Sequence, residues 1–212
     1  MHDAQEVKEG LWPGSDRGVG SDGMTSVDEP VDVIRTERID LHMVRPNEYA
    51  LLAVDRAAPG LWVDRGFSNP LRHLVDDPGP LPHRIPRIEA NPEAAAYLLR
   101  LAVLRSEGIV IGSAGFHDLP DEQGMIEVGL RVEPAYRGRG LATEMLLGMW
   151  DWVVSRSDVR ILRYTVSPGN LASQAIIAKF GFRHVGQQID HEDGPEDIFE
   201  MDVVAYRRLR GS

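Results

Sequence analysis

Residues 132–143 read VEPAYRGRGLAT, and two glycines in this stretch stand directly before an apolar pattern with helical spacing. Gly138 and Gly140 carry no side chain, so backbone N–H groups at these positions can approach a ligand closely. The helix expected after them points its unpaired first-turn N–H groups and the positive end of its dipole at the same place. Arg137 and Arg139 add positive charge. The stretch therefore predicts a site for an anion such as a diphosphate.

Three interpretations of this loop compete. A dinucleotide-binding fold requires Gly-x-Gly-x-x-Gly directly after a strand, whereas here the sixth position is Thr143 and residues 133–137 separate strand from turn. A mononucleotide P-loop requires Gly-Lys-Ser/Thr, a tripeptide that does not occur in the sequence. A glycine-rich connection that binds nothing remains open on the loop alone.

The apolar pattern on both sides of the loop predicts one mixed α/β domain. Alternating apolar residues indicate strands, and apolar residues three or four apart indicate helices. Three consecutive strands in the middle of the chain are joined by short turns, so they should be antiparallel, and the order of elements is not a βαβαβ ladder. We expect a single mixed, mostly antiparallel sheet flanked by helices. The expected strands are 38–44, 99–104, 109–117, 125–132, 161–166, 182–189 and 198–204, and the expected helices are 46–55, 93–97, 141–155 and 170–180.

Residues 56–92 are dense in proline, which predicts that they form no long regular element. Large apolar residues such as Trp62 and Phe67 are interspersed, and long loops of this kind are usually ordered and often functional. We expect an ordered loop that covers a pocket, with filling of the core as the alternative. Residues 1–30 are rich in Gly, Asp, Glu and Ser and are expected to be a disordered leader, so the folded domain should span 31–212.

The composition excludes several classes of protein. The 212 residues carry a net charge of −10, which argues against binding of a nucleic-acid backbone. Cysteine is absent, so disulfides, thiolate metal sites and a cysteine nucleophile are excluded. The histidines show no paired spacing for metal ligands, and the acidic stretch 190–197 lacks the calcium-loop pattern and is expected to be a turn. No apolar run is long enough for a membrane span and no signal peptide is recognisable, so we expect a cytoplasmic protein.

The loop resembles the acetyl-coenzyme A loop of the GCN5-related N-acetyltransferase (GNAT) family, which reads Gln/Arg-x-x-Gly-x-Gly/Ala. Arg137, Gly140 and Ala142 occupy its fixed positions. Residues 170–182, NLASQAIIAKFGF, resemble the second signature of the family, in which an Asn opens a helix that ends in Gly-Phe. The order of elements fits the family fold from about residue 35 to residue 206. The stretches TERIDL at residues 36–41 and GLATEM at residues 140–145 resemble the ribosomal-protein (Rim-type) branch of the family.

The resemblance implies an acetyl-coenzyme A-dependent N-acetyltransferase that moves the acetyl group directly to an amine. The amine can belong to a protein N-terminus, a lysine or a small molecule, and a homodimer is left open. The 56–92 loop would then cover the acceptor side. The family pattern assigns the pantetheine arm to the backbone of Leu130, Arg131 and Val132. It assigns the pyrophosphate to Arg137, Gly138, Arg139, Gly140, Leu141, Ala142 and Thr143, with Asn170 and Ser173 also near the donor.

Two residues are candidates for catalysis. Glu127 lies on the strand that leads to the loop, on the face opposite the apolar Ile126 and Val128, and the resemblance suggests it as the general base. An exposed or salt-bridged strand residue is the alternative. Many family members protonate the thiolate with a Tyr seven residues after the Asn, but that position holds Ile177. Rim-type members that lack the Tyr use a Ser one helical turn after the Asn, so the resemblance implies Ser173 as the thiolate partner, and a surface or cap serine is the alternative.

The missing Tyr gives some support to a second hypothesis, a catalytically degenerate module that binds acyl-coenzyme A without turnover. The intact loop together with Asn170, Ser173 and Glu127 favours the enzyme. Asn170 can cap its helix, bind the pantetheine, or do both. His117 follows a central strand and is a weaker candidate for the acceptor site.

Overall fold

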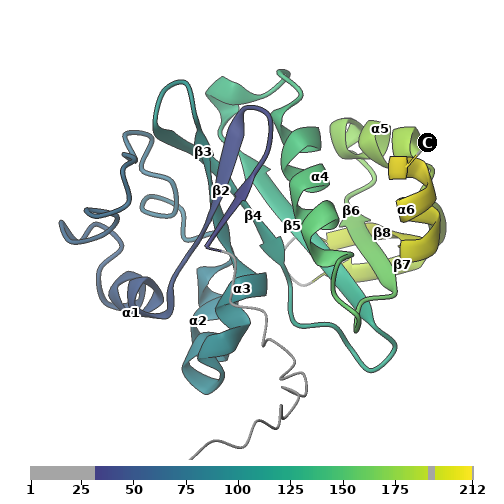
Figure 1. Ribbon diagram of the computed structural model, residues 1–212, viewed down its shortest axis with the longest axis horizontal. Coiled ribbons are helices and arrows are strands. Elements are labelled where there is room, and N and C mark those ends of the chain that lie inside the picture. Colours follow the sequence, from purple (N-terminus) through teal and green to yellow (C-terminus); the bar gives the residue numbers. More distant parts are fainter. Residues whose placement is uncertain (1–31, 191–193, 212) are drawn as a thin grey trace, which may run out of the picture.

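The computed structural model describes residues 32–190 and 194–211. The expected leader, residues 1–30, lies outside the described residues. One eight-stranded sheet crosses the molecule in the order β1-β2-β3-β4-β5-β6-β8-β7, with helices on both faces (Figure 1). The strands are β1 (Val33–Arg35), β2 (Ile39–Met43), β3 (Arg100–Leu104), β4 (Ile109–Phe116), β5 (Met125–Val132), β6 (Ile161–Val166), β7 (Arg183–Asp190) and β8 (Gly194–Asp202). The helices are α1 (Pro46–Val54), α2 (Leu81–Ala90), α3 (Ala95–Leu98), α4 (Leu141–Val153), α5 (Leu171–Phe180) and α6 (Val203–Gly211), and Pro92–Ala94 and Pro134–Tyr136 are short 3₁₀ turns.

The strand pairing confirms the expected mixed, mostly antiparallel sheet. β1 to β5 pair in sequence order and antiparallel, and β6, β8 and β7 form a second antiparallel set. β5 and β6 are the parallel neighbours, and α4 connects them. This connection is long enough to return the chain to the same end of the sheet, as parallel strands require.

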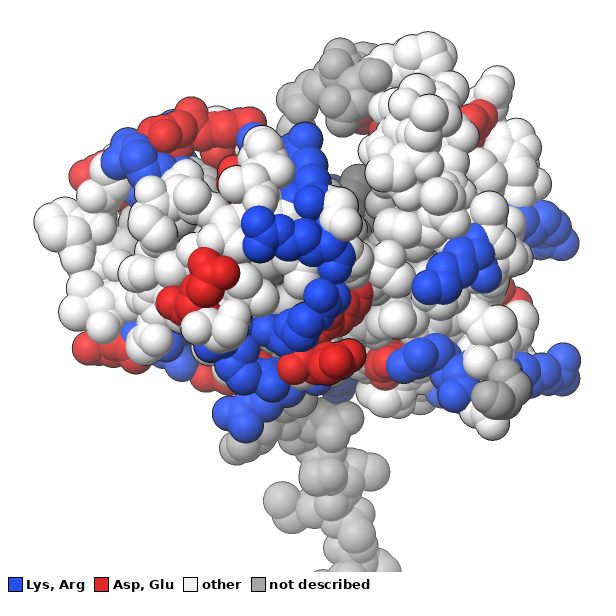
Figure 2. Space-filling model, turned by 90° about the horizontal axis from the view of Figure 1, so that it is seen from above, with Lys and Arg blue, Asp and Glu red and all other residues white. Residues whose placement is uncertain are grey.

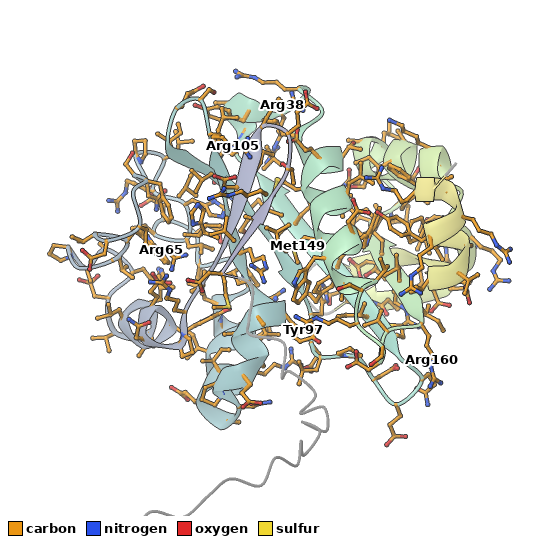
Figure 3. The ribbon with its side chains drawn as sticks, viewed as in Figure 1. Arg38, Arg65, Tyr97, Arg105, Met149 and Arg160 are labelled. Atoms are coloured by element: carbon orange, nitrogen blue, oxygen red, sulfur yellow. The ribbon has the colours of Figure 1, made fainter. Side chains whose placement is uncertain are left out.

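Each face of the sheet carries its own hydrophobic core. On one face, α4 buries Met145, Met149 and Trp150 completely against the sheet, and Met149 lies at the centre of the molecule (Figure 3). The other face packs against α1, α2 and α3. Tyr97 of α3 meets Trp152 of α4 with ring centroids 5.1 Å apart and contacts both cores. The two cores hold the sheet from both sides. The glycine loop follows β5, an inner strand of this sheet.

The proline-rich segment is not a loop throughout, because α2 occupies residues 81–90. Pro82 stands in the first turn, where its missing N–H would have no helical partner. Pro86 lies inside the helix, but it is exposed, so the carbonyl that it leaves unpaired can bond to water. Leu81, Arg84 and Ile88 are buried at helical spacing. This burial outweighs the proline penalty, and the prediction of no long regular element was wrong here.

The C-terminal prediction also needs correction. β8 begins at Gly194, paired with Asp190, so the acidic stretch is mostly strand and its connecting residues 191–193 lie outside the described residues. The chain becomes helical from Val203, and α6 buries Val203 and Tyr206 against the core. In the parts of the chain that the structure describes, no helix is long and apolar enough to cross a membrane.

Candidate active site

β5 and β6 pair over three residues and then separate. Their paired positions run from Met125 with Ile161 to Glu127 with Arg163. Beyond them a cavity of about 730 Å³ opens between the strands. Its wall includes most of the positions that the sequence suggested for the donor, namely Leu130, Arg131, Val132, Arg137, Gly138, Gly140, Leu141, Ala142, Thr143, Asn170 and Ser173. Arg139 and Glu127 are not among the lining residues.

The backbone of β5 offers polar groups to this cavity. His117 N donates to Glu127 O, and Glu133 N donates to Ile111 O, so the odd-numbered residues of β5 bond to β4. In an antiparallel pair the intervening residues point their N–H and C=O groups the other way. Leu130 therefore faces the gap between β5 and β6, whereas the backbone of Arg131 faces its β4 partner. An extended polar chain of the length of pantetheine can bond along this open edge.

The glycine loop fits a diphosphate. Gly138 and Gly140 have φ of 73° and 76°, a left-handed conformation that favours glycine. No side chain caps the N-terminus of α4, so its first N–H groups remain available for a ligand. A Cβ at Gly138 would meet nothing within 4 Å, which leaves open space beside the loop. Arg137 donates from Nε to Val132 O at 2.9 Å, which holds its guanidinium at the cavity wall.

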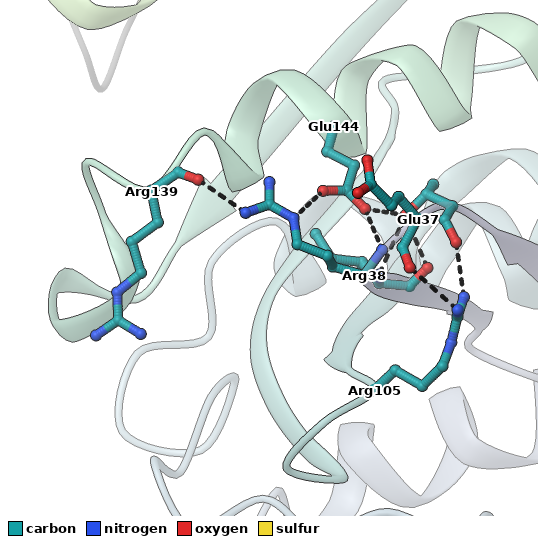
Figure 4. Close-up of polar contacts among 7 residues, drawn as sticks. Glu37, Arg38, Arg105, Arg139 and Glu144 are labelled. Atoms are coloured by element: carbon teal, nitrogen blue, oxygen red, sulfur yellow. Dashed lines mark hydrogen bonds and ion pairs between the residues drawn. The ribbon is translucent and has the colours of Figure 1, made fainter.

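A cluster of hydrogen bonds anchors the loop to the β1–β2 turn (Figure 4). The carboxylate of Glu144, in the first turn of α4, accepts from Thr36 Oγ1 at 2.6 Å and from Arg38 N and Nε at 2.6 and 2.7 Å. Arg38 also donates to Arg139 O at 3.1 Å. Arg139 itself stacks over the ring of Tyr136 at 4.8 Å, and its charge lies beside the loop rather than in the cavity wall. The anchor fixes the position and direction of α4.

The second signature forms a helix start at the cavity. Asn170 Oδ1 accepts from Ser173 N at 3.1 Å, so Asn170 is the cap of α5. Ser173 Oγ lies 3.0 Å from the hydroxyl of Tyr164 on β6, and both residues line the cavity. Burial raises the pKa of Tyr164, with the Ser173 contact acting in the opposite direction. Ile177, at the position where many members carry a Tyr, is buried in the core.

Glu127 lies behind the cavity wall, among polar side chains. Its carboxylate accepts from the hydroxyl of Thr165, and His117 Nδ1 is 3.6 Å away. Burial lowers the pKa of His117, Glu127 opposes this shift, and Arg84 and Arg87 reinforce it. Thr165 and His117 line the cavity, so they connect the carboxylate to its interior. This arrangement suits proton removal from a group in the cavity, followed by transfer toward water.

The segment between α1 and β3 lies against β4 and β5 near this point. Asp77 forms an ion pair with Arg131, and Arg87 of α2 donates to His117 O and pairs with Asp118 at 3.0 Å. Basic side chains run along the middle of the molecule beside the hollow between its two halves (Figure 2).

Sequence reasoning did not identify Tyr164 or Thr165. Both lie on the regular strand β6, where neither has a local signal of function. Their roles depend on residues 9 and 38 positions away, which only the folded chain brings together.

Known acetyltransferases resemble this chain in sequence. The family model described as acetyltransferase (GNAT) domain matches residues 78–183, which is half of the 212-residue chain. An uncharacterized N-acetyltransferase of Bacillus subtilis is 34% identical over 73 residues, covering 34% of this chain and 44% of the relative. The L-2,4-diaminobutyric acid acetyltransferase of Streptomyces coelicolor is 33% identical over 107 residues, covering 45% of this chain and 62% of the relative. The matches thus span less than two thirds of these two relatives.

Solved structures resemble the fold as a whole. RimJ of Mycobacterium smegmatis, in complex with a coenzyme A disulfide, has a TM-score of 0.57 and 18% sequence identity, covering 86% of this chain and 95% of that chain. At this identity the likeness concerns the fold alone, so the Rim-type branch stays a prediction.

Proposed function

The chain belongs to the acetyltransferase (GNAT) family, and we propose that it transfers an acetyl group from acetyl-coenzyme A to an amine. The observation that supports this most is the cavity between β5 and β6. It brings together a glycine loop suited to a pyrophosphate, an open strand edge suited to pantetheine and, behind its wall, a half-buried carboxylate suited to deprotonate an amine. The acceptor is a small-molecule or protein amine.

On the donor side, the N–H groups of residues 137–143 hold the pyrophosphate, and Leu130 and Val132 bond the pantetheine. These contacts place the thioester near Glu127, where the two strands begin to part. Asn170 fixes the start of α5 and so the position of Ser173. The donor is thereby oriented before the amine arrives, which lowers the entropic part of the barrier.

On the acceptor side, Glu127, which lies behind the cavity wall, takes the proton of the attacking amine through an intervening water. Thr165 donates to the carboxylate and orients it, and His117 offers a path for the proton to solvent. The amine nitrogen then bonds to the thioester carbon while the carbon–sulfur bond breaks. General-base catalysis of this kind contributes about 10²–10⁴-fold.

The Tyr164–Ser173 pair serves the leaving thiolate. The raised pKa of Tyr164 keeps its hydroxyl protonated, so it can donate to Ser173 Oγ. The Ser173 proton is then free to point at the sulfur. In this way the hydroxyl of Tyr164 on β6 helps to protonate the thiolate, a role for which many family members use a Tyr at the position of Ile177 on α5.

The test is release of coenzyme A thiol from acetyl-coenzyme A in the presence of an amine panel. The panel contains L-2,4-diaminobutyric acid, which the Streptomyces relative is named for, a lysine peptide and peptides with free N-termini. We expect turnover with at least one amine, and a fall in kcat of about 10²-fold or more for Glu127→Gln with unchanged coenzyme A affinity.

Glu122→Gln, at an exposed turn, is the matched control and should behave as the wild-type chain. Tight coenzyme A binding without turnover across the panel would overturn the proposal in favour of a binding module. Equal activity of Glu127→Gln and wild type would remove Glu127 as the base.

A further inference from the structure

His73 is a buried residue of the segment 69–79, and it takes no part in the contacts proposed above for acetyl-coenzyme A. Its side chain is 2% exposed. Nδ1 lies 2.5 Å from Glu133 Oε1, and Nε2 lies 2.9 Å from Ser113 Oγ on β4. Glu133 is the residue between β5 and the 3₁₀ turn that opens the glycine loop, and its carbonyl accepts from Tyr136 N at 2.8 Å. A single imidazole thus joins the covering segment, a central strand and the start of the loop.

The hydrogen-bond roles in this network follow from the charge state of the ring. Burial lowers the pKa of His73, and the bond to Glu133 opposes this shift. The neutral ring then donates its Nδ1 proton to the Glu133 carboxylate and accepts the Ser113 hydroxyl proton at Nε2. This is the order of a Ser-His-acid triad. Ser113, however, is 4% exposed and does not line the cavity, so no substrate reaches it and the network acts through position.

The backbone around His73 is bent to hold the ring in this place. Arg72 and Leu74, its two neighbours, have φ of 54° and 63°. A non-glycine residue in the left-handed region costs about 1–3 kcal/mol and persists only where the surroundings fix it. Asn69 supplies part of this restraint, because its side chain accepts from His73 N and donates to His73 O, both at 2.9 Å.

A second contact of the same segment reaches the cavity wall. Asp77 pairs with Arg131, which lines the cavity two residues before Glu133. Both contacts therefore hold the segment against the end of β5, directly before the glycine loop.

We propose that His73 is a positioning residue that ties the acceptor-side segment 69–79 to the start of the coenzyme A loop through Glu133. The identity of the ligand rests on the proposed function. Loss of the Glu133 contact lets residues 133–137 shift, so the loop presents its N–H groups less well. The contact with Ser113 secures the ring but does not touch the loop.

Two substitutions of His73 separate these contacts. The amide of Asn stands near the position of Nδ1 and can still donate to Glu133, whereas the amide of Gln reaches the position of Nε2 and Ser113. We expect His73→Gln to raise the Kd for coenzyme A and the KM for acetyl-coenzyme A about fivefold or more. His73→Asn should keep both near the wild-type values, and Ser113→Ala should lower the melting temperature without weakening coenzyme A binding.

Isothermal titration with coenzyme A and steady-state kinetics measure these effects, with melting curves to establish that each variant is folded. Should His73→Gln not fold, Glu133→Ala removes the acceptor of the same contact from its more exposed side and carries the same expectation. Unchanged Kd in His73→Gln, or equal weakening in Ser113→Ala, would overturn the inference. Wild-type binding without turnover would instead overturn the proposed function and leave the comparison of Kd values intact, and a wild-type chain that does not bind coenzyme A overturns both.

Discussion

Replacement of Gly138 by Ala tests whether the loop contacts a ligand, because its cost to the free protein is small and calculable. The residue has φ of 73°, and a Cβ built there meets nothing within 4 Å. The penalty is therefore the left-handed backbone alone, about 1–2 kcal/mol. For a domain of this size that corresponds to a fall in melting temperature of about 2–8 °C. The added methyl group stands where a pyrophosphate would lie, so we expect the Kd for coenzyme A to rise about tenfold or more.

Gly66 provides the matched control. It has φ of 71°, a Cβ there also meets nothing within 4 Å, and it does not line the cavity. Gly66→Ala should lower the melting temperature as Gly138→Ala does, but leave the Kd for coenzyme A unchanged in isothermal titration. An unchanged Kd in Gly138→Ala would refute the assignment of the loop. Equal rises in both variants would show that the effect comes from the fold.

Two further predictions concern stability. Glu144→Ala removes three hydrogen bonds that link α4 to Thr36 and Arg38, so we expect about 2–3 kcal/mol less stability and a melting temperature roughly 4–12 °C lower by calorimetry; a fall under about 2 °C would contradict the anchor. Burial lowers the pKa of His42 and His73 below the unfolded value of 6.5, so below about pH 6.5 the unfolded chain binds more protons than the folded chain. The stability that these two neutral rings contribute is therefore fully present above about pH 6.5 and is lost as the pH falls through that value. Urea unfolding at about pH 7.5 and about pH 5.5 measures the difference, and a free energy of unfolding that is equal or greater at the lower pH would contradict it.

Elements with a clear local period were predicted well. β5 and β6 have the expected bounds, because their alternation is regular and each is bounded by turn residues. α5 begins after Asn170 and ends at Gly181, whose φ of 72° suits the left-handed helix end. The edge strand β1 was missed because its three residues are too few to show a period. α2 was missed because proline content outweighed the spacing of its three buried residues in the prediction.

The residues of the candidate site also fall into those that the sequence predicts and those that it does not. The glycine loop and Asn170 are local signals, since each acts through a helix start that the neighbouring residues define. Tyr164 and His73 carry no such signal. Tyr164 matters because β6 runs beside α5, and His73 matters because a bent segment returns to β5. These positions are set by the pairing of distant elements, which no short stretch of sequence encodes.

The separation of β5 and β6 has a consequence for the lifetime of the protein. The two halves of the sheet share three paired positions at one end of the gap. A donor that lies along the open edge of β5 would act as an added strand and close the gap, so local opening of the halves would be slower in the occupied protein. Resistance to proteases would then rise and fall with the supply of thioester.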